Sequence, residues 1–180
     1  MNAPPSPPAS KPFPTWLIVV LCVVGFFVVF GGIFAALAIH GVRRYLANAK
    51  QAEARNSLGQ IARDAATAYA RDGALCASAS SPVPRSMSAL KGMKYQSAAG
   101  EWQVDRARNA GFACLGFSMD TPQYYQYSYT VPAGHPDEFD AVAHGDLNGD
   151  GQASTFRIRG RVINGVLEVA PNVEETSPEE

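Results

Sequence analysis

The stretch WLIVVLCVVGFFVVFGGIFAALAI, from Trp16 to Ile39, decides the fold of this chain. Its 24 residues include no charged side chain and no proline. An α-helix of that length rises about 36 Å, which is enough to cross the roughly 30 Å hydrocarbon core of a bilayer. The rest of the 180-residue chain is too small to bury such a helix on every side. We therefore predict one transmembrane helix over residues 16–39.

A cleaved secretory signal is the alternative interpretation of the same stretch. The triplet Ala36-Leu37-Ala38 has the small residues of a signal-peptidase site. However, the apolar run is much longer than the hydrophobic part of a usual signal, and only Lys11 supplies a positive side chain before it. These two features favour a membrane anchor.

The segments on either side of the anchor differ in character. Residues 1–15 contain six prolines among small and polar residues, so we expect a disordered tail. Residues 40–73 are rich in helix formers and end at a glycine, which predicts a soluble continuation of the helix. Its upstream part, residues 43–56, has no apolar stripe and is expected to form a solvated stalk or a surface for neighbouring subunits. The downstream part has a stripe that should pack on a globular body, made of Leu58, Ile61, Ala62, Ala65, Ala68 and Tyr69.

The remaining segments predict a loop, a sheet and a tail. Residues 74–112 are rich in Ser, Ala, Pro and Gly and are expected to form a connecting loop. Residues 113–170 predict an antiparallel sheet, with a type I′ turn at Asn164-Gly165. Residues 171–180 carry four glutamates and predict an acidic disordered tail. The expected strands are residues 113–119, 124–131, 139–144, 155–163 and 166–169.

The predicted fold class is therefore α+β. One long N-terminal helix, transmembrane in its first half, should pack on a four- to five-stranded antiparallel sheet.

Short motifs along the chain resemble those of a known family. AALAI at residues 35–39, RYLANAKQAEA at 44–54 and YARDG at 69–73 resemble the N-terminal helix of the bacterial type IV pilins and pseudopilins. GDLNGDG at 145–151, followed by STF and GRV, resembles the last strands of some pilin-like proteins. The resemblance covers residues 30–73 and 139–171. It implies a pilin-like fold and a structural role in a pilus or a related secretion-type assembly, with membrane lipid and other pilin-like subunits as partners.

The chain also departs from the pattern of that family. Gly25-Phe26 lies inside the apolar stretch without a basic leader, and no glutamate occurs between Met1 and Ile39. His40-Gly41 stands where a proline is common. We therefore expect a permanently anchored pilin-like protein, or a minor component, rather than a major pilus subunit.

The charges beside the anchor bear on its orientation. Arg43, Arg44, Lys50 and Arg55 follow the apolar stretch, so the positive-inside rule alone would place the C-terminal domain in the cytoplasm. Pilins share a basic start to their soluble helix and still export it. The resemblance therefore implies a single-pass protein of the bacterial inner membrane with a periplasmic or extracellular C-terminal domain.

Two cysteines lie outside the apolar stretch. Cys76 follows the expected helix and Cys114 lies in the first expected strand, so both are candidates for the region where the helix packs on the sheet. If the domain is exported, we predict a disulfide between them; the alternative is two buried reduced thiols.

A possible calcium loop begins at Asp146. Alternate oxygen-bearing residues in a glycine-containing loop can converge on a hard cation, as in the opening of an EF-hand loop. Position twelve, usually a bidentate Glu, is Arg157 here, and Asp137, Glu138 or Asp140 could complete the shell. The alternative is a hairpin turn whose side chains cap their own backbone. The candidate calcium ligands are Asp146, Asn148, Asp150, Gln152 and Ser154.

Other chemistry has little support in the sequence. The net charge of −1 gives no electrostatic reason to expect nucleic acid as a partner. His40, His135 and His144 lack metal-ligand spacing, and no phosphate loop or nucleophile elbow occurs. We expect no enzymatic activity and no required cofactor, with calcium the one candidate ligand. The alternative function is a bitopic envelope sensor whose small domain binds calcium or another ligand.

Overall fold

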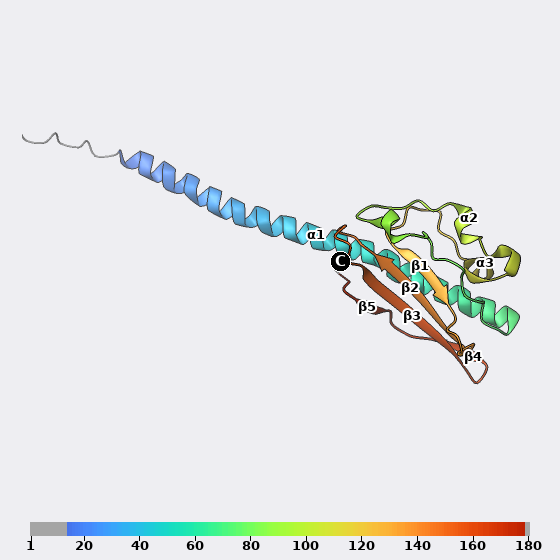
Figure 1. The fold of residues 1–180 in the computed structure, drawn as a ribbon. Helices are drawn as coiled ribbons and strands as arrows, with labels where there is room; N and C mark the ends of the chain where they lie inside the picture. The colour runs from blue at the N-terminus through green and yellow to red at the C-terminus, as the bar shows by residue number, and fades with distance from the viewer. Residues whose placement is uncertain (1–13, 179–180) are drawn as a thin grey trace, which may run out of the picture. The chain divides into compact units, whose positions relative to one another are not determined.

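The computed structural model describes residues 14–178, apart from the side chains of His40, Arg43 and Arg44. Most of the tail predicted over residues 1–15 therefore lies outside the described residues. The chain divides into two compact units, residues 1–45 and residues 46–180. The helix α1, Thr15–Asp72, contributes to both units (Figure 1).

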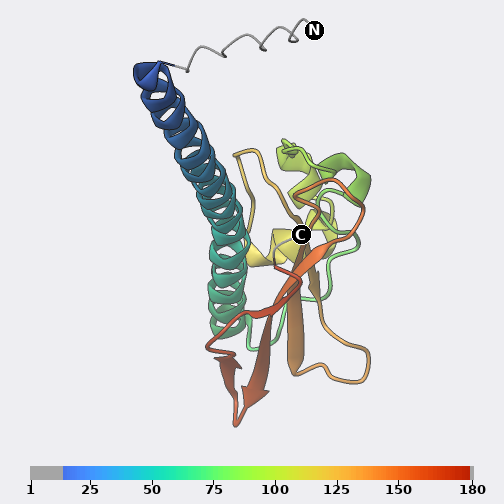
Figure 2. The same ribbon diagram turned by 90° about the vertical axis from the view of Figure 1, so that its left-hand side faces the viewer.

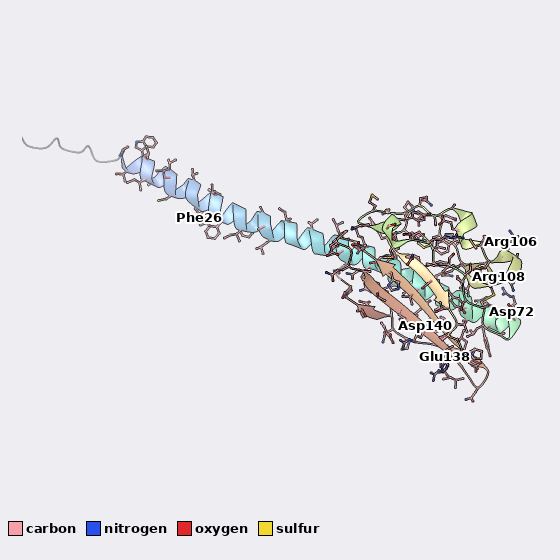
Figure 3. The ribbon with its side chains drawn as sticks, in the orientation of Figure 1. Phe26, Asp72, Arg106, Arg108, Glu138 and Asp140 are labelled. Carbon is pink, nitrogen blue, oxygen red and sulfur yellow. A yellow bond between two sulfur atoms is a disulfide. The ribbon has the colours of Figure 1, made fainter. Side chains whose placement is uncertain are left out.

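The part of α1 in the first unit is apolar and uncovered. Thr15–Ile39 is long and apolar enough to span a membrane, and none of its most apolar window is buried. Phe26, for example, projects from the helix and is 55% exposed (Figure 3). The prediction of an N-terminal helix suited to a single membrane crossing is confirmed.

The second unit contains a five-stranded antiparallel sheet in the order β1-β2-β3-β4, with β5 also paired to β3. The later part of α1 forms one layer and the strands the other (Figure 2). The predicted α+β class and antiparallel sheet are confirmed. Asn164 and Gly165 both have positive φ in the turn between β3 and β4, as the Asn-Gly pair predicts. The strands are β1 Gln126–Thr130, β2 Glu138–Gly145, β3 Ser154–Ile163, β4 Val166–Val169 and β5 Glu174–Thr176.

The strand predicted over residues 113–119 is wrong. The helix α3, Gly111–Leu115, covers the start of that range, and Gly116 ends it in the left-handed region at φ +76°. The predicted connecting loop also contains short helical elements, of which Figure 1 labels α2. These elements are η1 Met87–Leu90, α2 Ala99–Trp102 and η2 Arg106–Arg108.

The prediction of a disordered tail over residues 171–180 is also wrong for its described part. β5 pairs with Thr155–Arg157 of β3. Glu175 forms a two-pronged ion pair with Arg55 of α1, at 2.6 and 3.0 Å. Gln51 donates a hydrogen bond of 2.6 Å to the carbonyl of Pro178. Partners that are distant in sequence therefore order this acidic segment.

The predicted apolar stripe of α1 packs in the core, but packing begins earlier than predicted. Leu58 and Ile61 are fully buried, and Tyr69 at the end of the stripe is half-buried. Upstream, Gln51 and Ala54 are buried as well, so the solvated stalk predicted over residues 43–56 is wrong from Gln51 onward. The helix contributes mainly small residues to a core whose large members come from the sheet and loops. The rings of that core are Trp102, Phe112, Phe117, Tyr125, Tyr127, Tyr129, Phe139 and Phe156.

The predicted disulfide between Cys76 and Cys114 is present, with Cα atoms 5.9 Å apart. It joins the segment after α1 to α3 rather than to a strand. The bond closes a loop of sequence separation 38, which corresponds to about 4 kcal/mol in the chain-entropy model.

Two glycines on the inner face of the sheet lie under aromatic rings. Gly160 of β3 is in register with Phe139 of β2, and a Cβ built at Gly160 would lie 2.2 Å from the Phe139 ring. A Cβ at Gly145 would lie 2.6 Å from the ring of Tyr125. Each ring fills the space that a side chain would otherwise occupy, so these positions require glycine for packing reasons.

Gly160→Ala should therefore lower the free energy of unfolding by about 1–3 kcal/mol, because the methyl group must displace a fully buried ring. Urea unfolding of the full chain in detergent, followed by near-ultraviolet circular dichroism, measures this change. Gly100→Ala in α2 is the control, since nothing lies within 4 Å of a methyl group placed there and the change should not lower the free energy of unfolding. Equal stability of the two variants would contradict the packing argument.

Candidate functional site

The loop from Asp146 to Gln152 is held by side chains that bind its own backbone. The two carboxylate oxygens of Asp146 accept hydrogen bonds from the amides of Gly149 and Gly151, at 2.7 and 3.0 Å. Oδ1 of Asp150 accepts from the amide of Gln152 at 2.7 Å. Asp146 itself is only 5% exposed. This geometry is that of the self-capped turn that the sequence left open as an alternative.

The remaining predicted calcium ligands do not all gather at this loop. Ser154 begins β3, is fully buried, and donates its hydroxyl hydrogen bond to the carbonyl of Gly145. Oδ1 of Asn148 accepts from the amide of Asp150 at 2.9 Å. Among the described residues, no group of three or more His, Cys, Asp or Glu side chains is placed to hold a metal ion. Calcium at the loop therefore stays a prediction.

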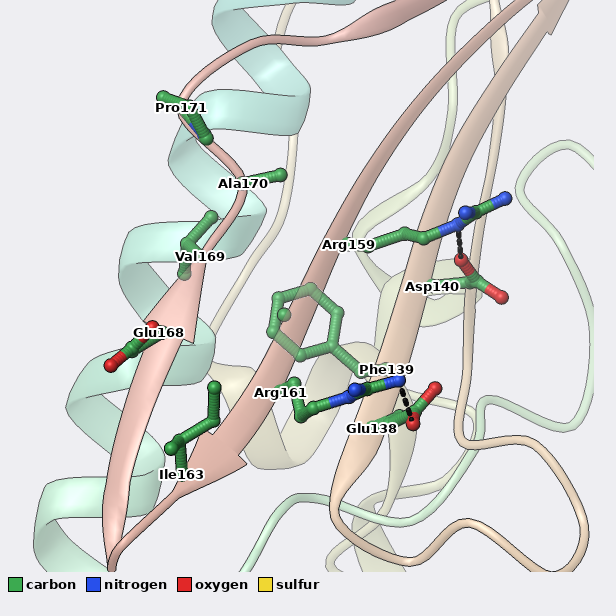
Figure 4. Close-up of a pocket in the computed structure, with 11 residues that line it drawn as sticks. Glu138, Phe139, Asp140, Arg159, Arg161, Ile163, Glu168, Val169, Ala170 and Pro171 are labelled. Carbon is green, nitrogen blue, oxygen red and sulfur yellow. Dashed lines mark hydrogen bonds and ion pairs between the residues drawn. The ribbon is translucent and has the colours of Figure 1, made fainter.

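The acidic residues proposed to complete a calcium shell lie elsewhere. Glu138 and Asp140 are in the first half of β2, whereas Asp146 follows its last residue. The distance along the strand from Asp140 to Asp146 is about 20 Å at the rise of a β-strand. Asp140 and Glu138 instead pair with arginines of β3 (Figure 4). The expectation that they could join the calcium site is wrong.

A groove of about 470 Å³ lies between the paired side chains of β2 and β3 and the strand β4 (Figure 4). Arg159 contacts Asp140 at 3.1 Å and Glu174 at 3.5 Å, and Arg161 contacts Glu138 at 2.6 Å. These cations are already paired with carboxylates, so the groove offers little net charge to an ionic ligand. Exposed pairs of this kind contribute little to stability, and they keep the outer face of the sheet polar.

A carboxylate at the seam between α1 and β1 was not singled out from the sequence. Oε1 of Glu53 accepts hydrogen bonds from the amide of Tyr124, at 2.8 Å, and from the hydroxyl of Tyr127, at 3.2 Å. Burial raises the pKa of Glu53, and the hydrogen bonds from Tyr124 and Tyr127 lower it in part. The side chains of Lys50 and Lys94 each lie 4.8 Å from the centre of the Tyr124 ring. Only the fold brings these groups together, so no local sequence signal could have found them.

The two histidines of the globular unit occupy separate places. Nδ1 of His144 lies 2.9 Å from the hydroxyl of Thr155, and burial, with the nearby charge of Arg157, lowers the pKa of His144. His135 lies before β2, with Nδ1 3.6 Å from Glu138. The fold does not unite them into one site.

Protein-family models, curated proteins and solved structures give no match to this chain. The resemblance of residues 30–73 and 139–171 to pilins therefore stays a prediction based on short motifs. The described fold agrees with its coarser part, an apolar N-terminal helix followed by an antiparallel sheet.

Calcium binding by the loop would raise the thermal unfolding midpoint of the full chain, because a ligand that binds only the folded state stabilises it. We expect a rise in millimolar calcium chloride relative to excess chelator, and no rise in the Asp150→Asn variant. Asp146→Ala should destabilise the protein by about 1–3 kcal/mol with or without calcium, since two amides of the turn lose their acceptor. A wild-type midpoint that does not respond to calcium would exclude the calcium prediction.

Ionisation of Glu53 should make the free energy of unfolding depend measurably on pH. Because its pKa is raised on folding, the native state binds the proton more tightly than the unfolded chain. The contribution of Glu53 to the free energy of unfolding should therefore fall as pH rises from its ordinary value of about 4.3 towards the raised one. Glu53→Gln keeps an oxygen acceptor and should flatten this slope.

Denaturation of wild type and Glu53→Gln across pH 4 to 7 measures the difference. The comparison variant Glu53→Ala should lose about 1–3 kcal/mol at every pH, because the amide of Tyr124 and the hydroxyl of Tyr127 lose their partner. If the free energy of unfolding changed with pH in the same way for wild type and Glu53→Gln, the pKa of Glu53 would not be raised on folding.

Proposed function

We propose that this chain is a membrane-anchored, pilin-like structural protein, a component of a pilus or a related secretion-type assembly. One observation carries the proposal. The same helix, α1, begins as an uncovered apolar segment and ends with a face of small residues packed on an antiparallel sheet. The motifs that resemble pilins lie on this helix, in the loop between β2 and β3, and on β3.

The disulfide supports a location outside the cytoplasm. Structural disulfides persist in oxidising compartments and are rare in the cytosol. The Cys76–Cys114 bond joins two segments around the aromatic core of the globular unit, which is where a structural bond belongs. We therefore propose that residues 46–180 lie on the periplasmic or extracellular side of a bacterial inner membrane.

The charged side chains of the globular unit support a structural rather than an enzymatic role. Arg55, Arg159 and Arg161 each pair with a carboxylate from another strand or segment. These pairs connect α1 with β5 and β2 with β3, and they leave these three arginines with carboxylate partners inside the chain. A protein of this kind acts through the surfaces that it presents to neighbouring subunits.

The apolar helix is the proposed contact between copies. Nothing lies within 4 Å of a methyl group built at Gly31 or Gly32, so the helix backbone is open to a neighbour there. Small residues at a helix surface let two membrane helices approach closely. Gly31 and Gly32, with Ala35 a turn later, are the proposed approach point.

Replacing Gly31, Gly32 and Ala35 with leucine should weaken self-association of the full chain by roughly tenfold, because bulky side chains hold the helices apart. Energy transfer between donor- and acceptor-labelled copies in detergent or vesicles measures association, and Cys22, the cysteine outside the disulfide, carries the dye. Gly32→Leu can be compared with Val19→Leu, an enlargement on the opposite side of the helix that should have little effect. A wild-type chain that stays monomeric at high concentration, and that copurifies with no pilus or secretion component, would contradict the proposed function.

A further inference from the structure

We propose that the membrane-contacting part of α1 continues past Ile39 to Tyr45, and that Arg43, Arg44 and Tyr45 bind the anionic headgroup layer of the bilayer. The inference rests on the proposed membrane anchoring of this helix. It adds a specific lipid contact that the apolar stretch alone does not predict.

The first support is exposed apolar surface beyond the apolar stretch. Val42 is 58% exposed and Tyr45 is 73% exposed, although both are large and largely apolar. By contrast Tyr125, Tyr127 and Tyr129 of the globular unit are fully buried. Burial of α1 side chains in that unit begins at Gln51, six residues after Tyr45. A partner is therefore expected for the surface at Val42 and Tyr45, and a bilayer interface offers an apolar layer beside a polar one.

The second support is the length between two aromatic residues. Trp16 stands at the start of the helix and is 66% exposed. From Trp16 to Tyr45 a helix rises about 44 Å, which matches the roughly 40–45 Å thickness of a bilayer with its headgroups. Tryptophan and tyrosine are enriched at both membrane interfaces, where their rings bridge apolar and polar layers. The two residues are thus spaced to lie at opposite interfaces.

The third support is the sign of the charge. The first 52 residues contain no Asp or Glu, and Glu53 is the first carboxylate of the chain. Arg43 and Arg44 immediately precede Tyr45 in the sequence, so the depth proposed for Tyr45 brings two cationic residues to the headgroup layer. Each basic residue at an anionic membrane surface contributes about 1 kcal/mol, a factor of about five in binding. Phosphate-bearing anionic lipids are the partner that this combination of aromatic and basic residues fits.

Depth measurements on the full chain test the inference. Nitroxide labels are attached one at a time through Val28→Cys, Leu46→Cys or Ala70→Cys in a Cys22→Ser background, with the protein in vesicles of phosphatidylcholine and phosphatidylglycerol. Leu46→Cys leaves Val42, both arginines and Tyr45 in place. Collision rates with oxygen and with a water-soluble nickel chelate then report depth. We expect a hydrocarbon depth at position 28, a headgroup depth at position 46 and an aqueous value at position 70.

The outcomes separate this inference from the proposed function. An aqueous value at position 46, equal to that at position 70, would overturn the inference while position 28 still reports hydrocarbon. An aqueous value at position 28 would instead overturn membrane anchoring itself, and the inference with it.

A charge test completes the design. Arg43→Gln with Arg44→Gln should lower the preference of the protein for phosphatidylglycerol over phosphatidylcholine by about fivefold for each arginine. The matched control, Arg63→Gln with Arg71→Gln, removes two arginines of the globular unit and should leave the preference unchanged. An unchanged preference in the first variant, or an equal loss in both, would overturn the role of the basic pair.

Discussion

The packing of small helix residues against large sheet residues is the constraint on which the globular unit depends. Ala54, Ala62, Ala65 and Ala68 make the helix face shallow, so the rings on the inner face of the sheet can approach the helix axis. Leu58 and Ile61 are the larger helix side chains in the same cluster. A helix with larger residues at the alanine positions would hold the sheet away and leave voids around the rings. The order of the unit therefore follows from complementary sizes rather than from any one strong bond.

Polar contacts mark the borders of this packed layer. On the side of β1, the carboxylate of Glu53 accepts a hydrogen bond from the amide of Tyr124. On the side of β5, Arg55 donates to the carboxylate of Glu175. Glu53 and Arg55 lie on the first turns of α1 that enter the unit, close to the buried side chains of Gln51 and Ala54. The same helix thus changes partner within a few residues, from the surroundings of the apolar segment to the interior of a small domain. A structural role in the envelope is consistent with that division of one helix between two environments.

Patterns of neighbouring residues predicted much of the fold, whereas contacts between distant residues escaped prediction. The apolar run, the helix stripe and the Asn164-Gly165 turn are set by local spacing, and the structure contains all three. The residues around Cys114 resemble a strand in composition, but they form a short helix that begins at Gly111 and ends before Gly116, two glycines with positive φ. The acidic tail looked disordered because its arginine partners lie far away in the sequence. The Asp146 loop was correctly placed at a turn, yet the sequence left open whether its oxygens face a cation or its own amides.

The ring-over-glycine pairs of the inner face have a consequence for how this sequence can vary over evolutionary time. Phe139 and Gly160 share one volume on adjacent strands, as do Tyr125 and Gly145. A relative with a larger residue at one member of a pair would need a smaller residue at the other. Substitutions at the two members of a pair should therefore be correlated among relatives. Substitutions at exposed positions nearby should not depend on one another in this way.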